Sequence, residues 1–191
     1  GIRANDFVHA IREDPQRAGL LYAGTEHGVY VSFDEGDHWK SLSLNLPDVQ
    51  VPDLVVEGRD LVIATHGRSF YVLDDLSPIR QMAPGPSTPA VHLFKPSDAV
   101  RRAYTANIDF YLESVTETIR LEVLDGKGAL VRELRVRGSG VKAGLNRLRW
   151  DLRWPGATVF EGMILESSSP RNGPWAPPGQ YAVRLTVGDQ S

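Results

Sequence analysis

Apolar and polar residues alternate along most of the first half of the chain, and this alternation predicts short β-strands. Gly, Pro, Asn, Asp and Ser separate the alternating runs. No run in this half has the 3.6-residue period of an amphipathic helix, so this half is expected to be all-β. The predicted strands cover residues 7–12, 20–24, 29–33, 38–42, 54–57, 61–65 and 69–74.

The second half alternates with the same period. In the run 147–154, two Leu and two Trp occupy one side and charged residues the other, and the run 181–187 repeats the pattern. One apolar and one polar face is typical of antiparallel strands that cover a single core. A hairpin turn is predicted at Asp125–Gly128. Residues 91–191 are therefore predicted to form a small β-sandwich, with a long loop rich in Pro, Gly and Ser at about 155–177.

An internal repeat organises the first half. Residues 21–34 are echoed by residues 61–75, with an offset of 40 positions at Leu21 and Leu61 and 41 positions at Tyr30 and Tyr71. A period of this length, built of short strands, is typical of β-propeller blades. The predicted fold class is all-β, with a partial β-propeller of about two blades followed by a β-sandwich.

Charge and proline content divide the chain at the same place. Residues 1–83 carry 7 basic and 13 acidic side chains, whereas residues 84–191 carry 14 basic and 11 acidic ones. Three prolines between positions 84 and 89 disfavour helix and central strand, which predicts a linker at 84–90. We therefore expect propeller blades over 1–83 and the sandwich over 91–191.

Composition narrows the function classes. The chain has 191 residues, no cysteine and a formal net charge of −3, which excludes disulfide and thiolate metal sites and gives no reason to expect a nucleic-acid partner. No apolar run approaches about 18 residues, so no membrane span is expected. No basic-then-apolar segment of a signal peptide opens the chain. Because it begins at Gly1 rather than Met, we interpret the chain as a piece of a longer protein.

The sharpest local motif is an Asp-box, S-x-D-x-G-x-x-W, formed by Ser32, Asp34, Gly36 and Trp39. An aspartate in such a turn can accept hydrogen bonds from the amides of its own turn. Gly36 permits a positive φ, and Trp39 supplies a large apolar ring. A catalytic or calcium-binding aspartate is the alternative. We favour a structural role and predict no metal and no cofactor.

With this motif on a repeat of about 40 residues, positions 6–80 resemble the Asp-box (BNR) repeat propellers. That family includes sortilin-type propellers, bacterial sialidases and xyloglucan-hydrolysing glycosidases. The second repeat departs from the pattern, because Asp74 and Asp75 are not followed by the Gly and Trp of the motif. The resemblance implies a bacterial glycosyl-hydrolase-like protein located in the periplasm or outside the cell.

The second half is similar to the immunoglobulin-like module of flagellar hook-capping proteins. The resemblance implies an immunoglobulin-like sandwich as the accessory domain. It rests on five short segments, residues 119–124, 128–132, 143–146, 150–151 and 178–181.

Two predicted turns carry candidate binding residues. His27 lies in the first and His66 and Arg68 lie in the second, each between the second and third strands of a repeat. In a propeller blade this turn lies opposite the Asp-box turn, on the side where ligands usually bind. A general base or a polysaccharide contact through Arg68 is one interpretation. The favoured one is a hydrogen bond between blades, because neither histidine has a nearby sequence partner that would set its pKa.

Aromatic residues in or beside the long loop are a third candidate. Trp154, Phe160 and Trp175 have the rings needed to stack on sugars, although such residues more often fix a loop to the core. Basic residues such as Arg101 and Arg102 are interpreted as part of a solvated sheet face rather than an anion site.

These observations lead to two functional hypotheses. The first is a non-catalytic binding or scaffolding role towards polysaccharide or protein. The second, which the resemblance alone implies, is part of a glycoside hydrolase, although no pair of carboxylates for glycoside hydrolysis can be assigned in this chain. The blade faces are expected to expose apolar residues that pack on the sandwich or on another chain. The expected contributors are Tyr30, Phe33, Trp39 and Tyr71.

Overall fold

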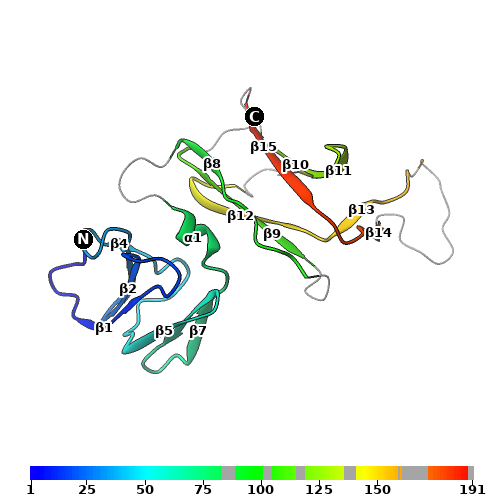
Figure 1. Ribbon diagram of the computed structural model, residues 1–191. Coiled ribbons are helices and arrows are strands. Elements are labelled where there is room, and N and C mark those ends of the chain that lie inside the picture. The colour runs from blue at the N-terminus through cyan, green and yellow to red at the C-terminus, as the bar shows by residue number, and fades with distance from the viewer. Residues whose placement is uncertain are drawn as a thin grey trace. The chain divides into compact units, whose positions relative to one another are not determined.

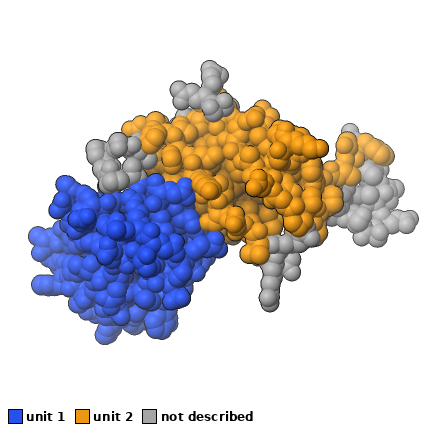
Figure 2. All heavy atoms as spheres, viewed as in Figure 1, with its two compact units in different colours: residues 1–88 blue, residues 89–191 orange. Residues whose placement is uncertain are grey.

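The computed structural model places the chain in two compact units, residues 1–88 and 89–191 (Figures 1 and 2). Of the predicted linker at 84–90, residues 84–88 lie outside the described part of the chain. The structure describes residues 1–82, 89–100, 105–114, 119–135, 141–158, 160 and 172–188.

The predicted all-β class is confirmed, since several antiparallel sheets make up both units. A single turn of helix, α1 (Ser77–Gln81), follows the last strand of unit 1. Pro78 lies in the first turn of α1, where its missing N–H group costs no hydrogen bond. No helix in the described part of the chain has the length and hydropathy that crossing a membrane requires.

Unit 1 contains two antiparallel sheets in which every strand pairs with its neighbours in sequence. Sheet A has four strands and sheet B has three. The strands of sheet A are β1 (Val8–Glu13), β2 (Leu21–Thr25), β3 (Gly28–Ser32) and β4 (Lys40–Ser41). The strands of sheet B are β5 (Asp53–Glu57), β6 (Asp60–Ala64) and β7 (Phe70–Leu73).

One hydrophobic core joins the two sheets of unit 1. At Gly24 in β2 the backbones come so close that an added Cβ atom would lie 2.7 Å from the carbonyl oxygen of Val51. Because only glycine fits there, this position sets the spacing of β2 and the segment leading to β5. The buried side chains of this core are Leu20, Tyr22, Val29, Val31, Val49, Val51, Leu54, Leu61, Ile63, Leu76 and Ile79.

A buried ion pair ties α1 to the β1–β2 connection. The Nε atom of Arg80 lies 2.9 Å from Oδ2 of Asp14, and only 10% of the Arg80 side chain and none of the Asp14 side chain is exposed. The hydroxyl of Tyr22 donates to the same carboxylate at 3.2 Å, and burial of Tyr22 raises its pKa. Arg80 also donates to the carbonyl oxygen of Gly58, in the β5–β6 turn. This network therefore connects both sheets of unit 1.

Unit 2 is built from two three-stranded sheets and a separate strand pair. One sheet has the order β12-β9-β8 and the other the order β11-β10-β15, while β13 pairs with β14. The strands are β8 (Val91–Leu93), β9 (Ala106–Leu112), β10 (Ile119–Asp125), β11 (Leu130–Arg135), β12 (Gly144–Trp150), β13 (Arg153–Pro155), β14 (Asn172–Trp175) and β15 (Tyr181–Val187).

Both sheets contribute to the core of unit 2. Alternate residues of β9 and β10 point into it, as the period-two pattern of these segments predicts. The predicted turn Asp125–Gly128 joins β10 to β11, where Asp125 accepts hydrogen bonds from the amides of Lys127 and Ala129. The buried side chains are Ile108, Phe110, Leu112, Leu121, Val123, Val131, Val141, Trp150, Ala176, Leu185 and Val187.

Two local expectations need correction. Strand β14 occupies residues 172–175, which fall inside the predicted loop at 155–177; of that loop, residues 159 and 161–171 lie outside the described part. Tyr30 is not an exposed blade-face residue, because it is only 6% exposed and its hydroxyl donates to Asp6 at 3.0 Å.

The exposed apolar side chains of sheet B lie elsewhere. Val55, Val62 and Val72 are aligned across β5, β6 and β7 by the strand register. Phe70 is 74% and Val72 54% exposed. The outer face of sheet B therefore carries an apolar row, although Tyr71 and Phe33 pack against the core.

Candidate functional site

The Asp-box residues form a closed hydrogen-bonded turn after β3. The Ser32 hydroxyl donates to Oδ1 of Asp34 at 2.9 Å, and the Gly36 amide donates to Ser32 Oγ at 2.9 Å. The amide of His38 donates to Asp34 Oδ1 at 2.9 Å, and His38 Nδ1 lies 2.7 Å from Oδ2. Both carboxylate oxygens of Asp34 therefore have partners within the turn itself.

The backbone conformation of this turn explains why a glycine occupies position 36. Gly36 has a φ of 99°, a conformation that glycine adopts without steric cost. The half-buried Trp39 ring lies over it, 3.7 Å from the position that a Cβ atom of residue 36 would occupy. The hydrogen bonds from the His38 amide and imidazole lower the pKa of Asp34. These contacts describe a carboxylate that closes a turn.

The β2–β3 turn carries His27 and lies opposite the Asp-box turn along β3. The His27 amide donates to Oδ1 of Asp6 at 3.0 Å, and its Nδ1 atom lies 2.8 Å from Oδ1 of Asp48. The hydrogen bond to Asp48 raises the pKa of the His27 imidazole. His27 thus pairs with a carboxylate 21 positions away in the sequence, a partner that the local sequence pattern does not reveal.

Asp6 is buried next to this turn and accepts hydrogen bonds from it. Burial of Asp6 acts to raise its pKa, but hydrogen bonds from Thr25, from the Tyr30 hydroxyl and from the His27 amide outweigh it, and the pKa is lowered. The carboxylate is therefore held in its charged form beneath the turn. It fixes the backbone that presents Glu26 and His27.

A second histidine–carboxylate pair lies beside the first. His9 Nε2 of β1 is 2.8 Å from Oε2 of Glu26. The side-chain amide of Gln50 donates to the same oxygen at 3.1 Å. Three segments distant in sequence therefore meet at Glu26, and all three side chains remain partly accessible to solvent.

The second predicted turn, between β6 and β7, lies at the same end of unit 1. The His66 amide donates to the carbonyl oxygen of Gln50 at 2.9 Å, so Gln50 contacts both predicted turns. Gly67 and Ser69 have φ values of 80° and 63°, which shape the turn. The side chains of His66 and Arg68 are exposed. The structure thus brings His27, His66 and Arg68 to one end, as the strand order implies.

We call this end of unit 1 the turn surface. Sequence reasoning identified its two turns but missed the residues that complete it, because they come from other segments whose positions depend on the strand pairing. Its members are His9, Glu26, His27, Asp48, Gln50, His66 and Arg68.

The aromatic candidates of unit 2 have different surroundings. The Arg153 guanidinium lies 3.7 Å from the centre of the Trp175 ring, so this ring is stacked within the protein. Trp154 packs against the core of unit 2. Phe160 is exposed. Trp154 therefore packs the β13–β14 pair on the core of unit 2, and Trp175 stacks on Arg153 within that pair.

Within the described residues, no group of three or more His, Asp or Glu side chains is placed to hold a metal ion. Comparisons of the chain with protein-family models, with curated proteins and with solved structures found no match.

Proposed function

We propose that the chain is a non-catalytic binding module whose turn surface contacts a polysaccharide. One observation carries this proposal: hydrogen-bonding side chains from β1, from the segment that holds Asp48 and Gln50, and from two turns gather at one end of unit 1, where all are at least partly exposed. Sugars present many hydroxyl groups that donate and accept hydrogen bonds. The imidazole, amide, carboxylate and guanidinium groups of the turn surface match such a ligand.

The arrangement of the carboxylates favours binding over hydrolysis. Glycoside hydrolysis uses two carboxyl groups, one of which donates a proton to the leaving oxygen. On the turn surface Glu26 and Asp48 are each engaged by an imidazole at 2.8 Å, while Asp6 is buried and has a lowered pKa. These contacts support a role for the carboxylates in orienting His9 and His27.

Arg68 is the residue on which binding should depend most. Its guanidinium is exposed on a turn whose backbone is fixed by the bond between His66 and Gln50. A charged donor that bonds a ligand hydroxyl stabilises a complex more than a neutral donor does. The proposal includes the periplasmic or extracellular location that a polysaccharide partner implies.

The test is a glycan array probed with the intact chain, followed by titration of each glycan that binds. Arg68→Ala should weaken binding about tenfold or more. Arg59→Ala is the matched control, because Arg59 is also exposed in unit 1 but lies in the β5–β6 turn, at the other end of β6.

The same glycans should be incubated with the chain and assayed for released reducing ends. Binding without turnover supports the proposal. Turnover that disappears in Glu26→Gln or Asp48→Asn would show a glycoside hydrolase instead. Equal loss in Arg68→Ala and Arg59→Ala, or no glycan bound, would exclude the turn surface as the site.

A further inference from the structure

In the part of unit 2 that the structure describes, two edge strands border an open side. Strand β15 ends the order β11-β10-β15 and β8 ends the order β12-β9-β8. Within the described residues β15 pairs only with β10, over seven residue pairs from Tyr181 to Val187. The outer side of an edge strand carries N–H and C=O groups that a further strand can bind.

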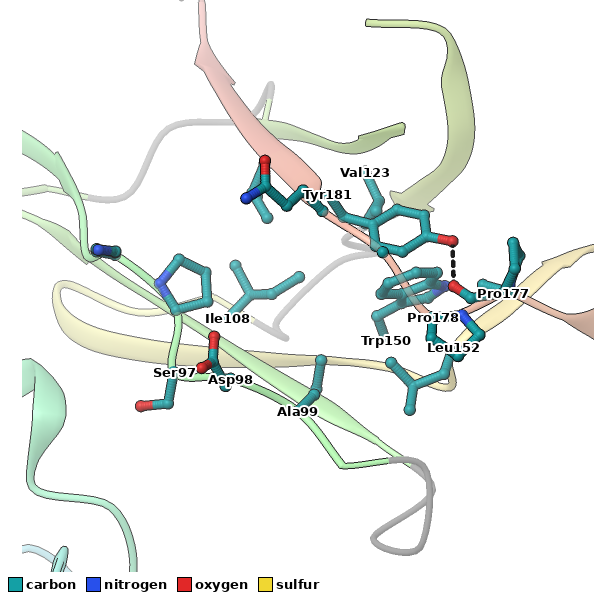
Figure 3. A pocket seen from close by; sticks show the side chains of 17 residues that line it. Ser97, Asp98, Ala99, Ile108, Val123, Trp150, Leu152, Pro177, Pro178 and Tyr181 are labelled. Carbon is teal, nitrogen blue, oxygen red and sulfur yellow. Dashed lines mark hydrogen bonds between the residues drawn. The ribbon is translucent and has the colours of Figure 1, made fainter. Parts of the chain in front are cut away.

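A hollow of about 500 Å³ opens beside the first half of β15. Trp150 and Tyr181 lie on one side of it, and Ser97, Asp98 and Ala99 lie across from them (Figure 3). This volume is in the range that binds small ligands or large side chains.

The polar atoms of the two rings are already used inside the protein. The Tyr181 hydroxyl donates to the carbonyl oxygen of Pro177 at 2.7 Å, as the dashed line in Figure 3 marks. The indole N–H of Trp150 donates to the carbonyl oxygen of Arg153 at 3.0 Å. Trp150 is buried, so its ring offers no open face for a sugar to stack on. The hollow therefore suits an apolar group.

A second hollow of about 480 Å³ adjoins the other half of β15. Val91 and Leu93 of β8 line it together with Leu185 of β15, and Val183 lines both hollows. Along an extended strand, side chains two residues apart lie about 7 Å apart and point the same way. Alternate side chains of one added strand could therefore enter both hollows.

The charge of Arg184 indicates which kind of residue the added strand should carry between those two side chains. Arg184, the central residue of β15, lies between the core residues Val183 and Leu185, is 53% exposed and also lines the second hollow. Its Nη1 atom is 3.7 Å from Glu122, a long ion pair. An acidic residue on an added strand, opposite Arg184, would form a favourable cross-strand pair. Antiparallel pairing of two copies, centred on β15, would instead set Arg184 against its own counterpart.

We propose that the β8–β15 side of unit 2 binds an extended peptide segment of a partner protein by strand addition to β15. The segment has apolar side chains at alternate positions, which enter the two hollows, and an acidic residue between them that faces Arg184. Recognition of this kind takes affinity from backbone hydrogen bonds and specificity from pockets for alternate side chains. It is independent of the function proposed for unit 1.

The test begins with selection of random displayed peptides on the intact chain. Enriched peptides should alternate apolar residues with one acidic residue. A selected peptide, made synthetically, should then shift the amide resonances of β15 and the indole resonance of Trp150 in NMR spectra of the whole chain.

Backbone methylation of the peptide separates strand addition from simple pocket binding. N-methyl groups at alternate positions whose N–H groups face β15 should weaken binding about tenfold or more, whereas methylation at the intervening positions should have little effect. This comparison leaves the protein unchanged, so its folding does not enter.

Charge pairing is tested with Arg184→Gln. The intact chain should prefer the peptide with Glu over the peptide with Gln by about two- to fivefold, and the variant should lose this preference. Arg149→Gln, an exposed arginine on the edge strand β12 of the other sheet, should keep it. No enrichment, equal effects of both methylation patterns, or a dimer that pairs through β15 would each overturn the proposal.

Discussion

Asp34 closes the Asp-box turn with its carboxylate, which accepts hydrogen bonds from the hydroxyl of Ser32 and from the amide and imidazole of His38. We expect Asp34→Ala to lower the melting temperature of unit 1 by a few degrees, because the turn loses its acceptor. Asp34→Asn should be milder, because its carbonyl oxygen can still accept. Thermal unfolding followed by circular dichroism measures both.

The pH dependence of this turn has a definite sign. The pKa of Asp34 is lowered below its ordinary value of 3.8 in the folded protein, so its stabilising contribution is present above that value and is lost as the pH falls through the folded pKa. The melting temperatures of wild type and Asp34→Asn should therefore converge at acid pH. A gap that widened on acidification, or loss of glycan binding without loss of stability, would contradict a structural role.

His27 offers a direct measurement of an ion pair on the turn surface. Its pKa is raised above 6.5, chiefly by the hydrogen bond to Asp48. The stabilisation is therefore present below 6.5 and is lost as the pH rises through the raised pKa. NMR titration should show Asp48→Asn returning the His27 pKa towards 6.5. Asp60→Asn, at the other end of β6, should leave it unchanged, and an unaltered pKa in Asp48→Asn would contradict the pairing.

The sequence predicted the turn residues more successfully than their partners. The motif spacing places Ser32, Asp34 and Gly36 in one turn, because all their contacts are local. The bond between His9 and Glu26 spans 17 positions, and the bond between Gln50 and Glu26 spans 24. Such contacts depend on how strands align, and a local pattern does not specify that alignment.

At the scale of elements, the ion pair of Asp14 with Arg80 joins α1 to the β1–β2 connection. Removing one partner leaves the other charge buried, so Arg80→Ala should destabilise unit 1 by about 3–5 kcal/mol. Arg12→Ala is the matched control: Arg12 bonds Asp53 at 2.6 Å, but these side chains are 45% and 60% exposed. Arg12→Ala should lower the free energy of unfolding of unit 1 by at most about 1 kcal/mol.

Hydrogen exchange of unit 1 amides, measured by mass spectrometry in increasing urea, reports these changes without interference from unit 2. If Arg80→Ala and Arg12→Ala lowered the free energy of unfolding equally, the prediction that the buried ion pair matters more than the exposed one would be wrong. Asp14→Asn should fall between the two variants, because it removes the charge and keeps a hydrogen-bonding group.

The hydrophobic periodicity of the sequence did not predict the short elements α1 and β14. Helix α1 has five residues, and of these only Pro78 and Ile79 are buried, too few to produce a 3.6-residue pattern. Strand β14 contains a glycine and a proline, residues that are depleted in strands. The longer runs at β9, β10, β12 and β15 alternate clearly because each covers the core of unit 2 with one face.

At the scale of the whole molecule, the change in charge and composition near residue 84 lies a few positions before the boundary between the two units, at residues 88 and 89. Each unit has its own core. The period of about 40 residues anticipated two successive antiparallel sheets in unit 1. The exposure of individual side chains was harder to predict. Tyr30 is buried, and its hydroxyl donates to Asp6, a residue 24 positions away in the sequence.

The outer face of sheet B should make unit 1 associate with a second copy. Val55 and Val72 are exposed beside Phe70, with the half-buried Val62 between them, while Glu57 and Asp60 face each other at one end of this row. Two copies that meet through this face bury apolar surface but bring carboxylates together. Added salt should therefore strengthen the association, because it screens the repulsion and leaves the hydrophobic contribution in place.

Light scattering across a range of protein concentrations should show a mass that rises with concentration, and that rises further in about 0.5 M salt, where the screening length is about 4 Å. Val72→Lys and Phe70→Lys should each keep the chain monomeric, because they place a charge in the apolar row. Leu44→Lys alters another exposed apolar side chain of unit 1, outside sheet B, and should associate like the wild type. A wild-type chain that stays monomeric at every concentration and salt level would show that this face does not bind a second copy.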